Sequence, residues 1–436
     1  MQGSIPRSLQ TTSVRSITCR TLLTLGFVLV CTVSLTSCRE QKWEVSKRAR
    51  AQDYTVAAAL GDLGHGTIRD LDAADVPELE APAGLRPCCA FGADLKVKLG
   101  AVPVPGVELG NIVSLEDIGP HVYDNGLVSV NAADNRGPVD DEKNGLVYTC
   151  RGGFVDVAHI RDNADLTMFL VMALGRIMDE GGEIALPDQG GRVTVRVEPV
   201  SPETLRRHGR KLIATRAAQW VAYQMSIWHE IATWYGHSSI ELWPEKISAF
   251  SPEDLYSNMI GVKIAGGITM NSQAASEDTY NHSMDAWIDR VLDRLQALPA
   301  RQQSVDAMML VDGLWWDSGR RIPDWKLTKR RHMEIGTEVH PWLVPDATGI
   351  DPDDAAAFDA CDGAGEPLVL RNPGGFEGVE FSTPLTVEID LDDKLAAVFP
   401  LPRSPSRIVT QADFPTVVEA IRRENAAEMG DDADRP

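Results

Sequence analysis

The sequence predicts an α+β fold with a central helical part, flanking β segments and an inserted hairpin. Three features predict it: short apolar or alternating runs within residues 85–150, long helical patterns in the middle of the chain, and further short runs after residue 385. The chain has 436 residues, of which 43% are hydrophobic and 24% charged, so it can build a large core. Because no linker or internal repeat stands out, we expect residues 85–425 to form a single domain, followed by an acidic tail at 426–436.

The first 37 residues are typical of an export signal. They contain three arginines and no acid, and an apolar run at 22–34 leads to small residues before Cys38. Residues 35–38, Leu-Thr-Ser-Cys, resemble a bacterial lipobox, in which the cysteine is acylated and the chain is cut before it. We therefore expect residues 1–37 to be a lipoprotein signal peptide, and residues 38–84 to be an acylated cysteine with a flexible tether. The alternative is a plain signal peptide in which Cys38 is incidental.

A lipid on Cys38 would place the protein in the cell envelope, anchored to a membrane. Arg39 follows Cys38 where some lipoproteins have aspartate, and by resemblance to lipoprotein sorting this favours the outer membrane, facing the periplasm. The formal net charge of -21 argues against nucleic acid as a partner, because nucleic-acid binding needs a basic face. The expected partners are therefore the membrane and an envelope polymer or protein.

Four cysteines other than Cys38 remain after such processing: Cys88, Cys89, Cys150 and Cys361. An oxidising periplasm permits disulfides, and the four allow three pairings, of which the one joining adjacent Cys88 and Cys89 is disfavoured. A catalytic thiol is a further alternative. The sequence leaves the pairing open.

The elements are expected in the following order. Turn residues and alternating patterns predict strands at 102–107, 126–130 and 146–150, and a hairpin at 183–199. Apolar spacing, N-cap residues and glycine stops predict helices at 154–180, 201–235, 251–266, 282–298, 302–317 and 413–428. Two late strands are predicted at 387–391 and 396–399.

The first block with chemical potential is residues 152–165, where a predicted strand enters a helix. Backbone N–H groups at such a start can bind anions, and Asp156 is placed to cap the helix. His159 and Arg161 follow close to several carboxylates, a pattern that suits proton transfer or metal binding. The structural alternative is that Asp156 is only a cap, Arg161 pairs with Asp165, and His159 is a satisfied, half-buried histidine.

The second block, residues 226–237, contains the pair His229-Glu230 on a predicted helix. The zinc-protease pattern needs a second histidine four residues after the first, and Thr233 stands there, so that pattern is not met. Glu230 lies among aromatic residues, and burial there would raise its pKa and suit an acid or base. Alternatively, Glu230 is exposed or pairs with an arginine.

The third block, residues 248–258, begins a helix with Ser251 and Asp254 in a capping-box spacing. Tyr256 and Asn258 are candidates for pocket lining. A fourth block contains Trp315-Trp316, which we expect in the core unless the pair stacks on a sugar. The chain has no P-loop, dinucleotide-binding, nucleophile-elbow or EF-hand motif, which removes the commonest nucleotide, α/β-hydrolase and calcium interpretations.

Taken in this order, the lipobox and the three blocks resemble the bacterial lipoproteins grouped as domain of unknown function 4056, over roughly residues 85–400. The resemblance implies an envelope lipoprotein with no assigned reaction. Its recurrent positions fall here on Asp156, His159, Arg161, Glu230, Trp234, Gly236, Ser251, Asp254, Tyr256 and Asn258.

Two functions are compatible with these residues. The absence of a complete catalytic motif favours a non-catalytic lipoprotein that binds a partner protein or an envelope glycan. The alternative is an envelope hydrolase, possibly metal-dependent, with catalytic and binding residues drawn from the blocks above. In that case His159 is a base or metal ligand, Glu230 an acid/base or ligand, and Arg161 an anion clamp. The full candidate set has Asp156, His159, Arg161 and Glu230 as catalytic and Trp234, Asp254, Tyr256 and Asn258 as binding residues. The identity of any metal or cofactor stays open.

Overall fold

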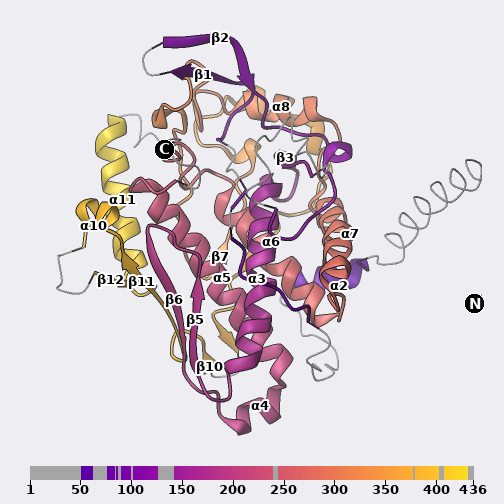
Figure 1. Cartoon of the computed structure of the whole chain (residues 1–436). Coiled ribbons are helices and arrows are strands. Elements are labelled where there is room, and N and C mark those ends of the chain that lie inside the picture. The colour runs from indigo at the N-terminus through magenta and orange to yellow at the C-terminus, as the bar shows by residue number, and fades with distance from the viewer. Residues whose placement is uncertain are drawn as a thin grey trace, which may run out of the picture. The chain divides into compact units, whose positions relative to one another are not determined.

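The computed structural model describes residues 51–61, 76–83, 85–86, 90–99, 102–125, 142–238, 244–376, 379–401 and 407–430. These lie in a compact unit that spans Ala51–Pro436 (Figure 1). The predicted signal peptide, Cys38, Cys88, Cys89 and the predicted strand at 126–130 lie outside the described residues. No helix in the described ranges has the length and apolar character needed to cross a membrane.

Three long helices form the centre of the unit, namely α3 (Val157–Ile177), α5 (Arg210–Trp234) and α6 (Asp254–Met270). Each packs against the other two, and nearly every residue of α6 is buried. Most residues of α6 are apolar or small, as a helix buried on all sides requires, and its buried polar residues include Asp254, Asn258 and Lys263. The three helices therefore enclose whatever polar groups they carry.

Two further helices cover α6, and one of them lies in the predicted tether. These are α7 (Glu277–Leu295) and α2 (Asp53–Gly61), which pack against α6 and against each other. Val56 and Leu60 of α2 are buried in the main core. The compact unit therefore begins before the expected boundary at residue 85.

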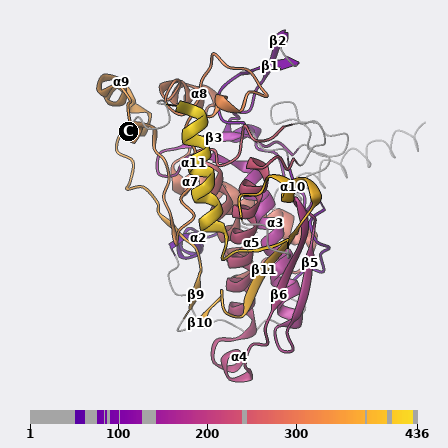
Figure 2. The same cartoon turned by 90° about the vertical axis from the view of Figure 1, so that its left-hand side faces the viewer.

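A four-stranded antiparallel sheet lies beside α5, in the order β12 (Ile408–Thr410), β11 (Leu385–Leu391), β6 (Gly191–Val197), β5 (Gly182–Leu186). In β6 every second residue is buried, as expected for a sheet with one face on the core. The hairpin predicted within 183–199 is β5–β6. The C-terminal helix α11 (Phe414–Met429) also packs on α5 (Figure 2). Helices and antiparallel strands together confirm the α+β class.

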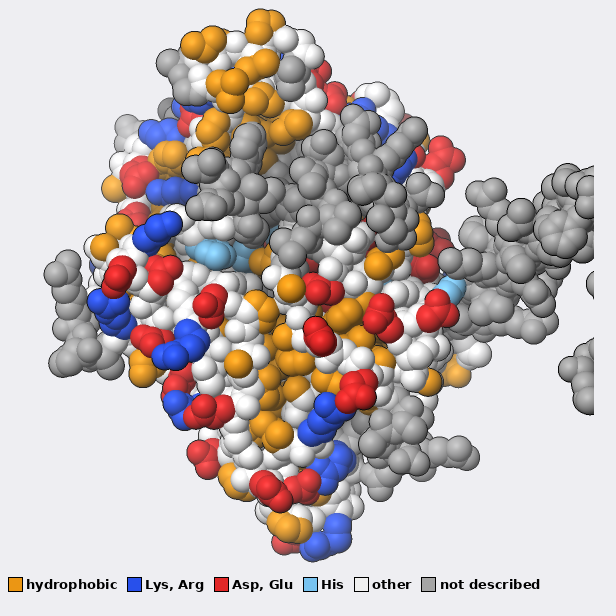
Figure 3. Space-filling view, in the orientation of Figure 1, with side chains coloured by type: hydrophobic (Ala, Val, Ile, Leu, Met, Phe, Trp, Pro, Cys, Tyr) orange, Lys and Arg blue, Asp and Glu red, His pale blue; other side chains and the backbone are white. Residues whose placement is uncertain are grey.

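A second apolar core lies around Trp315 and Trp316, both of which are buried there. It involves β1 (Leu95–Leu99), β3 (Leu146–Thr149), β4 (Gly153–Asp156) and α8 (Arg301–Leu310). The strand β2 (Val102–Leu109) pairs with β1, and hydrophobic side chains are exposed at this hairpin in Figure 3. The tryptophan pair therefore lies in the core, as expected, and is not an exposed platform on which a sugar could stack.

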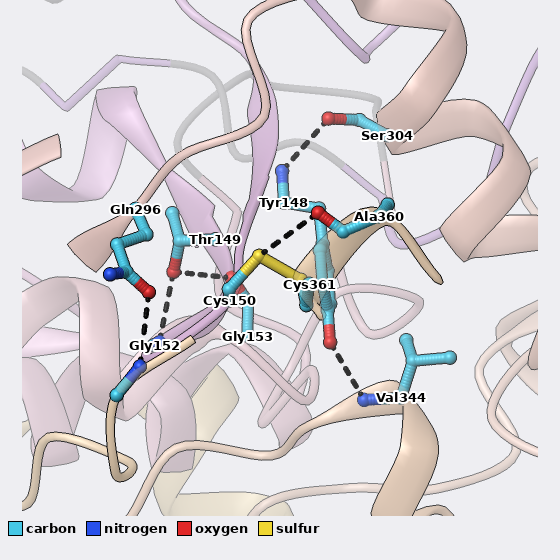
Figure 4. Close-up of a disulfide and its surroundings, with 11 residues drawn as sticks. Tyr148, Thr149, Cys150, Gly152, Gly153, Gln296, Ser304, Val344, Ala360 and Cys361 are labelled. Carbon is cyan, nitrogen blue, oxygen red and sulfur yellow. Dashed lines mark hydrogen bonds between the residues drawn. A yellow bond between two sulfur atoms is a disulfide. The ribbon is translucent and has the colours of Figure 1, made fainter. Parts of the chain in front are cut away.

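A disulfide joins Cys150, directly after β3, to Cys361 (Figure 4). Next to it, the Tyr148 hydroxyl accepts a hydrogen bond from the backbone N–H of Val344 at 3.0 Å. Among the three complete pairings of the four cysteines, Cys150–Cys361 occurs only in the one that also joins Cys88 to Cys89, which the sequence disfavoured; Cys88 and Cys89 lie outside the described residues.

The remaining short elements connect these layers. They are α4 (Pro202–His208), α9 (Pro352–Ala357), α10 (Asp393–Val398), β7 (Glu338–Val339), β8 (Leu370–Arg371), β9 (Gly375–Phe376) and β10 (Val379–Glu380), with 3-10 turns at Leu115–Asp117, Trp325–Leu327, Val344–Asp346 and Asp359–Cys361.

Several predicted boundaries differ from the structure for identifiable reasons. The helix predicted at 201–235 is two helices, because Gly209 has a φ of 80° that a helix cannot contain. The helix predicted to stop at Gly266-Gly267 continues to Met270. A Cβ at Gly266 would lie 2.1 Å from the Gln219 amide nitrogen, so this glycine permits close packing rather than ending the helix. The segment 396–399, predicted as a strand, lies mostly in α10, and α11 extends into the predicted tail.

Candidate functional site

Three helices bring together three of the candidate residues. His159 is in the first turn of α3, Glu230 is in the last turns of α5, and Asp254 begins α6. Each offers one ligand atom, all three atoms lie within 4.8 Å of one another, and all three residues are buried. We call these residues the acidic centre.

The start of α3 fixes the position of His159. The Asp156 carboxylate accepts a hydrogen bond from the Ala158 N–H at 2.8 Å, which is the expected N-cap. The Asp156 N–H in turn donates to Ser257 Oγ at 2.9 Å, which ties the strand–helix junction to α6. His159 Nδ1 lies 3.4 Å from Asp254 Oδ1.

The loop before α6 holds the two carboxylates. The Phe250 N–H donates to Glu230 Oε2 at 2.7 Å, and the Ser251 N–H donates to Asp254 Oδ2 at 2.5 Å. The second bond is the half of the expected capping box in which the acid reaches back, whereas the Ser251 hydroxyl donates to Ser248 instead of capping. The other carboxylate oxygens, Glu230 Oε1 and Asp254 Oδ1, accept no hydrogen bond from an N–H group of the described residues, whereas a hydrogen bond between the two carboxyls lowers the pKa of Glu230.

The acidic centre lies beside two further buried carboxyls, Asp156 and Glu253. Both oxygens of Glu253 and one of Asp156 also lack a hydrogen-bond partner in the described part of the chain. Burial raises the pKa of Glu230, and burial together with repulsion between the acids raises the pKa of Glu253 and Asp254 well above the usual range. So many buried acids require either bound protons or a bound cation.

Arg331 supplies positive charge near the acidic centre. Burial lowers the pKa of its guanidinium to about 10, while Asp254 and Glu230 act in the opposite direction. The guanidinium donates to the carbonyl of Ala249 and lies 5.2 Å from the ring centroid of Trp234. Trp234 therefore packs against the arginine that faces the acidic centre.

The donor set of the acidic centre fits a divalent metal ion. It combines one imidazole nitrogen with two carboxylate oxygens, ligands that zinc and the neighbouring first-row metals accept. Two such ligands bound to one ion are separated by at most about 4.4 Å, twice the longest metal–oxygen distance. The three ligand atoms lie within 4.8 Å of one another, and the His159–Asp254 pair is 3.4 Å apart. Small side-chain movements would therefore suffice to bind an ion.

A solvent-connected pocket adjoins His159. Its lining comes from α3, α5, α6, the β5–β6 turn and the segment at 85–86: Leu85, Arg86, His159, Asp162, Asn163, Leu166, Gln189, Met225, Ser226, His229 and Asn258. Burial lowers the pKa of His229 to about 3, so this ring is neutral, and burial raises the pKa of Asp162 to about 7. The Asn258 side-chain oxygen accepts from Asn163 Nδ2 at 2.6 Å. Eight of the eleven lining residues carry polar side chains, although most of the lining surface is apolar.

Behind the pocket lies a buried charge network around Arg86. Its guanidinium donates to Asp162 at 2.7 Å, Asp165 at 3.1 Å and Glu142 at 3.0 Å. Arg161 belongs to the same network, with an ion pair to Glu142 at 3.4 Å. Sequence reasoning did not single out Arg86 or Glu142, because neither lies near a recognisable block and their partners are distant in the chain.

The remaining predicted residues have other surroundings. Arg161 donates to the carbonyls of Lys143 and Gly119 and does not line the pocket. The Tyr256 hydroxyl donates to the carbonyl of Leu368 at 2.7 Å, and Trp234 Nε1 donates to Glu424 of α11 at 2.8 Å. The structure thus brings His159, Glu230 and Asp254 together and places Asn258 in the pocket. It places Arg161, Trp234 and Tyr256 in structural contacts.

These observations describe an α+β protein with a buried acidic centre at the junction of three helices. The model of a family described as "Protein of unknown function (DUF4056)" matches residues 76–345, and the chain belongs to this family. The match covers the acidic centre and the pocket and ends well before residue 400, the expected limit of the resemblance. No curated protein and no solved structure matches the chain.

Proposed function

We propose that this protein is a lipid-anchored envelope hydrolase whose acidic centre binds a divalent metal ion. One observation carries the proposal: His159, Glu230 and Asp254 place ligand atoms within 4.8 Å of one another from three different helices. The sequence alone favoured a non-catalytic binding protein, and the hydrolase was its alternative.

The energetics of burial support a cation at this position. Burying a carboxylate without a partner is costly, and such acids are usually protonated, paired or bound to metal. Here the oxygens of Glu230 and Asp254 that accept no N–H hydrogen bond are in the same small volume as His159. A divalent ion would provide a positive partner for both oxygens at once.

The adjoining pocket supports chemistry rather than a purely structural ion. A site with three protein ligands leaves a coordination position for water, and a metal ion lowers the pKa of bound water enough to make it a nucleophile near neutral pH. His159 belongs both to the acidic centre and to the pocket lining, so it marks where the two meet. Arg161 has no part in this proposal, since its Nη1 and Nη2 groups donate to the carbonyls of Lys143 and Gly119 and to the Asn144 side chain.

The envelope location is supported by two features that are independent of the site. The lipobox-like residues 35–38 provide the acylation site at Cys38. The disulfide between Cys150 and Cys361 is of a kind that persists in oxidising compartments and is rare in the cytosol.

Metal content tests the proposal. The exported full chain would be extracted with detergent, supplied with zinc, manganese or iron(II), dialysed, and measured by elemental mass spectrometry. We expect about one ion per chain, lost in His159→Ala and in Glu230→Gln. Glu253→Gln is the matched control, because Glu253 is an equally buried acid next to Asp254 but outside the three-ligand group. A wild-type chain without metal, or equal metal in His159→Ala, would overturn the proposal.

A further inference from the structure

The hairpin of β1 and β2 carries an apolar face that continues beyond the core (Figure 3). Alternate residues of a strand share a face, so the pattern of β1 places Leu95, Val97 and Leu99 on the same side. Leu95 and Val97 are buried, whereas the side chain of Leu99 is 70% exposed. The apolar face of β1 therefore extends past the residues that cover its first half.

Val102 of β2 completes the exposed end of this face. It pairs with Leu99 directly across the hairpin, and opposed residues of an antiparallel pair project from the same side of the sheet. Val102 is 67% exposed, and Pro103 next to it is exposed as well. Leu99 and Val102 thus form one exposed aliphatic surface, which we call the hairpin patch.

The base of the hairpin is fixed to the rest of the protein. The Ile322 N–H donates to the Lys96 carbonyl at 2.8 Å, and the Lys98 N–H donates to the Ile322 carbonyl at 2.9 Å. Ile322 itself is buried in the second apolar core. The hairpin patch therefore lies at the end of a strand pair whose base is held in place.

The size of the hairpin patch favours a lipid surface over a second protein. A stable protein–protein interface buries about 800 Å² on each partner and involves about 20–30 residues a side. The hairpin patch has two large aliphatic side chains. Insertion between lipid headgroups needs no wide complementary surface, because interfacial apolar groups bury only about 5–10 Å into the bilayer.

The charges of the hairpin suit anionic lipid. Lys96 is exposed and Lys98 is half-buried, and the sole acid among residues 95–109 is Glu108, which pairs with Lys96 across the strands. Lys98 also lies 3.8 Å from Asp324. In the sequence, residues 39–50 contain five basic and two acidic residues, although the whole chain has a formal net charge of -21. Basic residues close to a bilayer are attracted to anionic headgroups.

The proposed lipid on Cys38 would keep the hairpin close to a bilayer. Ala51, where the compact unit begins, is 13 positions after Cys38, and an extended chain of this length spans at most about 45 Å. A compact unit of the size of Ala51–Pro436 has a radius of gyration of about 21 Å. The length of the tether is thus comparable to the size of the unit.

We infer that the hairpin patch docks onto the anionic lipid surface of the membrane that holds the anchor. In this contact Leu99 and Val102 enter the headgroup region and Lys96 faces the lipid phosphates. The inference rests on the lipid-anchored part of the proposed function and does not involve the acidic centre. A weak contact suffices, because the anchor gives the hairpin a high effective concentration at the membrane.

Binding to vesicles by a chain without lipid tests the inference. The mature chain, from residue 38 onward and with Cys38→Ser, would be sedimented with vesicles of phosphatidylethanolamine and phosphatidylglycerol. We expect Leu99→Asp and Val102→Asp each to lower the partition coefficient by at least about tenfold, because each replaces a buried aliphatic group with a charge. Val398→Asp is the matched control, since Val398 is a 54% exposed aliphatic residue of α10, and it should bind like the parent chain.

Equal partitioning of Leu99→Asp and the parent chain, or a parent chain that does not sediment with the vesicles, would overturn the inference. Urea midpoints equal to that of the parent chain would show that the exposed substitutions leave the fold intact. Binding of the parent chain to phosphatidylcholine vesicles should be weaker than to the mixed vesicles, and Lys96→Glu should reduce this difference. Equal binding to both kinds of vesicle would contradict recognition of anionic lipid.

Two further measurements separate the inference from its alternatives. A dimer in sedimentation equilibrium that Leu99→Asp dissociates would assign the hairpin patch to a second copy of the chain and overturn the lipid contact. Mass spectrometry of the native chain shows whether Cys38 carries acyl chains. A native chain without them would overturn the lipid anchor of the proposed function, whereas the vesicle measurements decide the role of the hairpin.

Discussion

Gly261 of α6 lies directly against the backbone of Ile160 in α3, so that a Cβ at Gly261 would stand 2.1 Å from the Ile160 carbonyl oxygen. Ile160 follows His159, and Gly261 is two turns into the helix that Asp254 begins. The close approach of the two helices at this point therefore sets the distance between the histidine and the aspartate of the acidic centre. Only glycine permits this approach.

Gly261→Ala should lower both stability and metal affinity. The methyl group must push α3 and α6 apart, and overpacking of this kind costs about 1–3 kcal/mol. Urea unfolding and metal titration would measure the two effects. Gly374→Ala is the control, because a Cβ there meets nothing within 4 Å. Unchanged metal affinity in Gly261→Ala would show that the helix spacing does not set the geometry of the centre.

Divalent metal ions should stabilise the folded chain through the acidic centre. A ligand that binds only the native state at one hundred times its dissociation constant adds about 2.7 kcal/mol to the free energy of unfolding. We expect the melting temperature of the metal-free chain to rise on adding the ion and to fall again with a chelator.

Glu230→Gln should remove this response to metal. The metal-free variant should nevertheless be at least as stable as the metal-free wild type, because the change removes one acid whose pKa is raised by burial. A metal-dependent rise in melting temperature equal to that of the wild type would place the ion elsewhere.

Arg86→Met should destabilise the protein strongly. The substitution keeps much of the side-chain volume but leaves Glu142, Asp162 and Asp165 without their shared cation. Removing one partner from a buried ion pair costs about 3–5 kcal/mol. Arg192→Met is the matched control, because its pair with Asp390 is exposed, and such pairs contribute about 1 kcal/mol or less. Similar unfolding midpoints in urea for the two variants would refute the prediction.

His332 should make the protein less stable in acid. Burial lowers its pKa in the folded state to about 4, from the usual 6.5, so the folded chain takes up this proton less readily than the unfolded chain. Its stabilising contribution is therefore complete above pH 6.5 and is lost as the pH falls toward 4, by up to about 3 kcal/mol. Glu334, whose carboxylate is 4.0 Å from Nε2, raises the pKa of His332, whereas His340 and Arg422 lower it.

The difference in unfolding free energy between wild type and His332→Gln, measured from pH 7 to pH 4, isolates this group from the others. The difference should shrink as the pH falls. A difference that is independent of pH would show that His332 is not the titrating group.

The sequence could predict the separate blocks of the site but not how they meet. The sequence places His159 and Glu230 in helical segments rich in apolar residues but leaves open whether either side chain is buried. Their meeting with Asp254 depends on how α3, α5 and α6 pack, and that packing uses contacts such as Gly261 with Ile160, which no local pattern records.

The spacing of Arg161 and Asp165 predicts an ion pair that the structure does not contain. Arg161 and Asp165 are four residues apart on a helix, a spacing that favours an ion pair. In the structure Arg161 pairs with Glu142, whereas the Asp165 carboxylate accepts from Arg86 and from the Tyr280 hydroxyl. The distant partners prevail because both side chains are buried, where a carboxylate needs several donors at once.

The disulfide between Cys150 and Cys361 imposes an order of events on the newly made chain. The two cysteines are 211 positions apart, and Cys361 lies beyond the segment that matches the family. During synthesis the thiol of Cys150 must wait until most of the polypeptide has emerged before its partner exists. The helices that carry the acidic centre all precede Cys361 in the chain, so they are made before the covalent link can close.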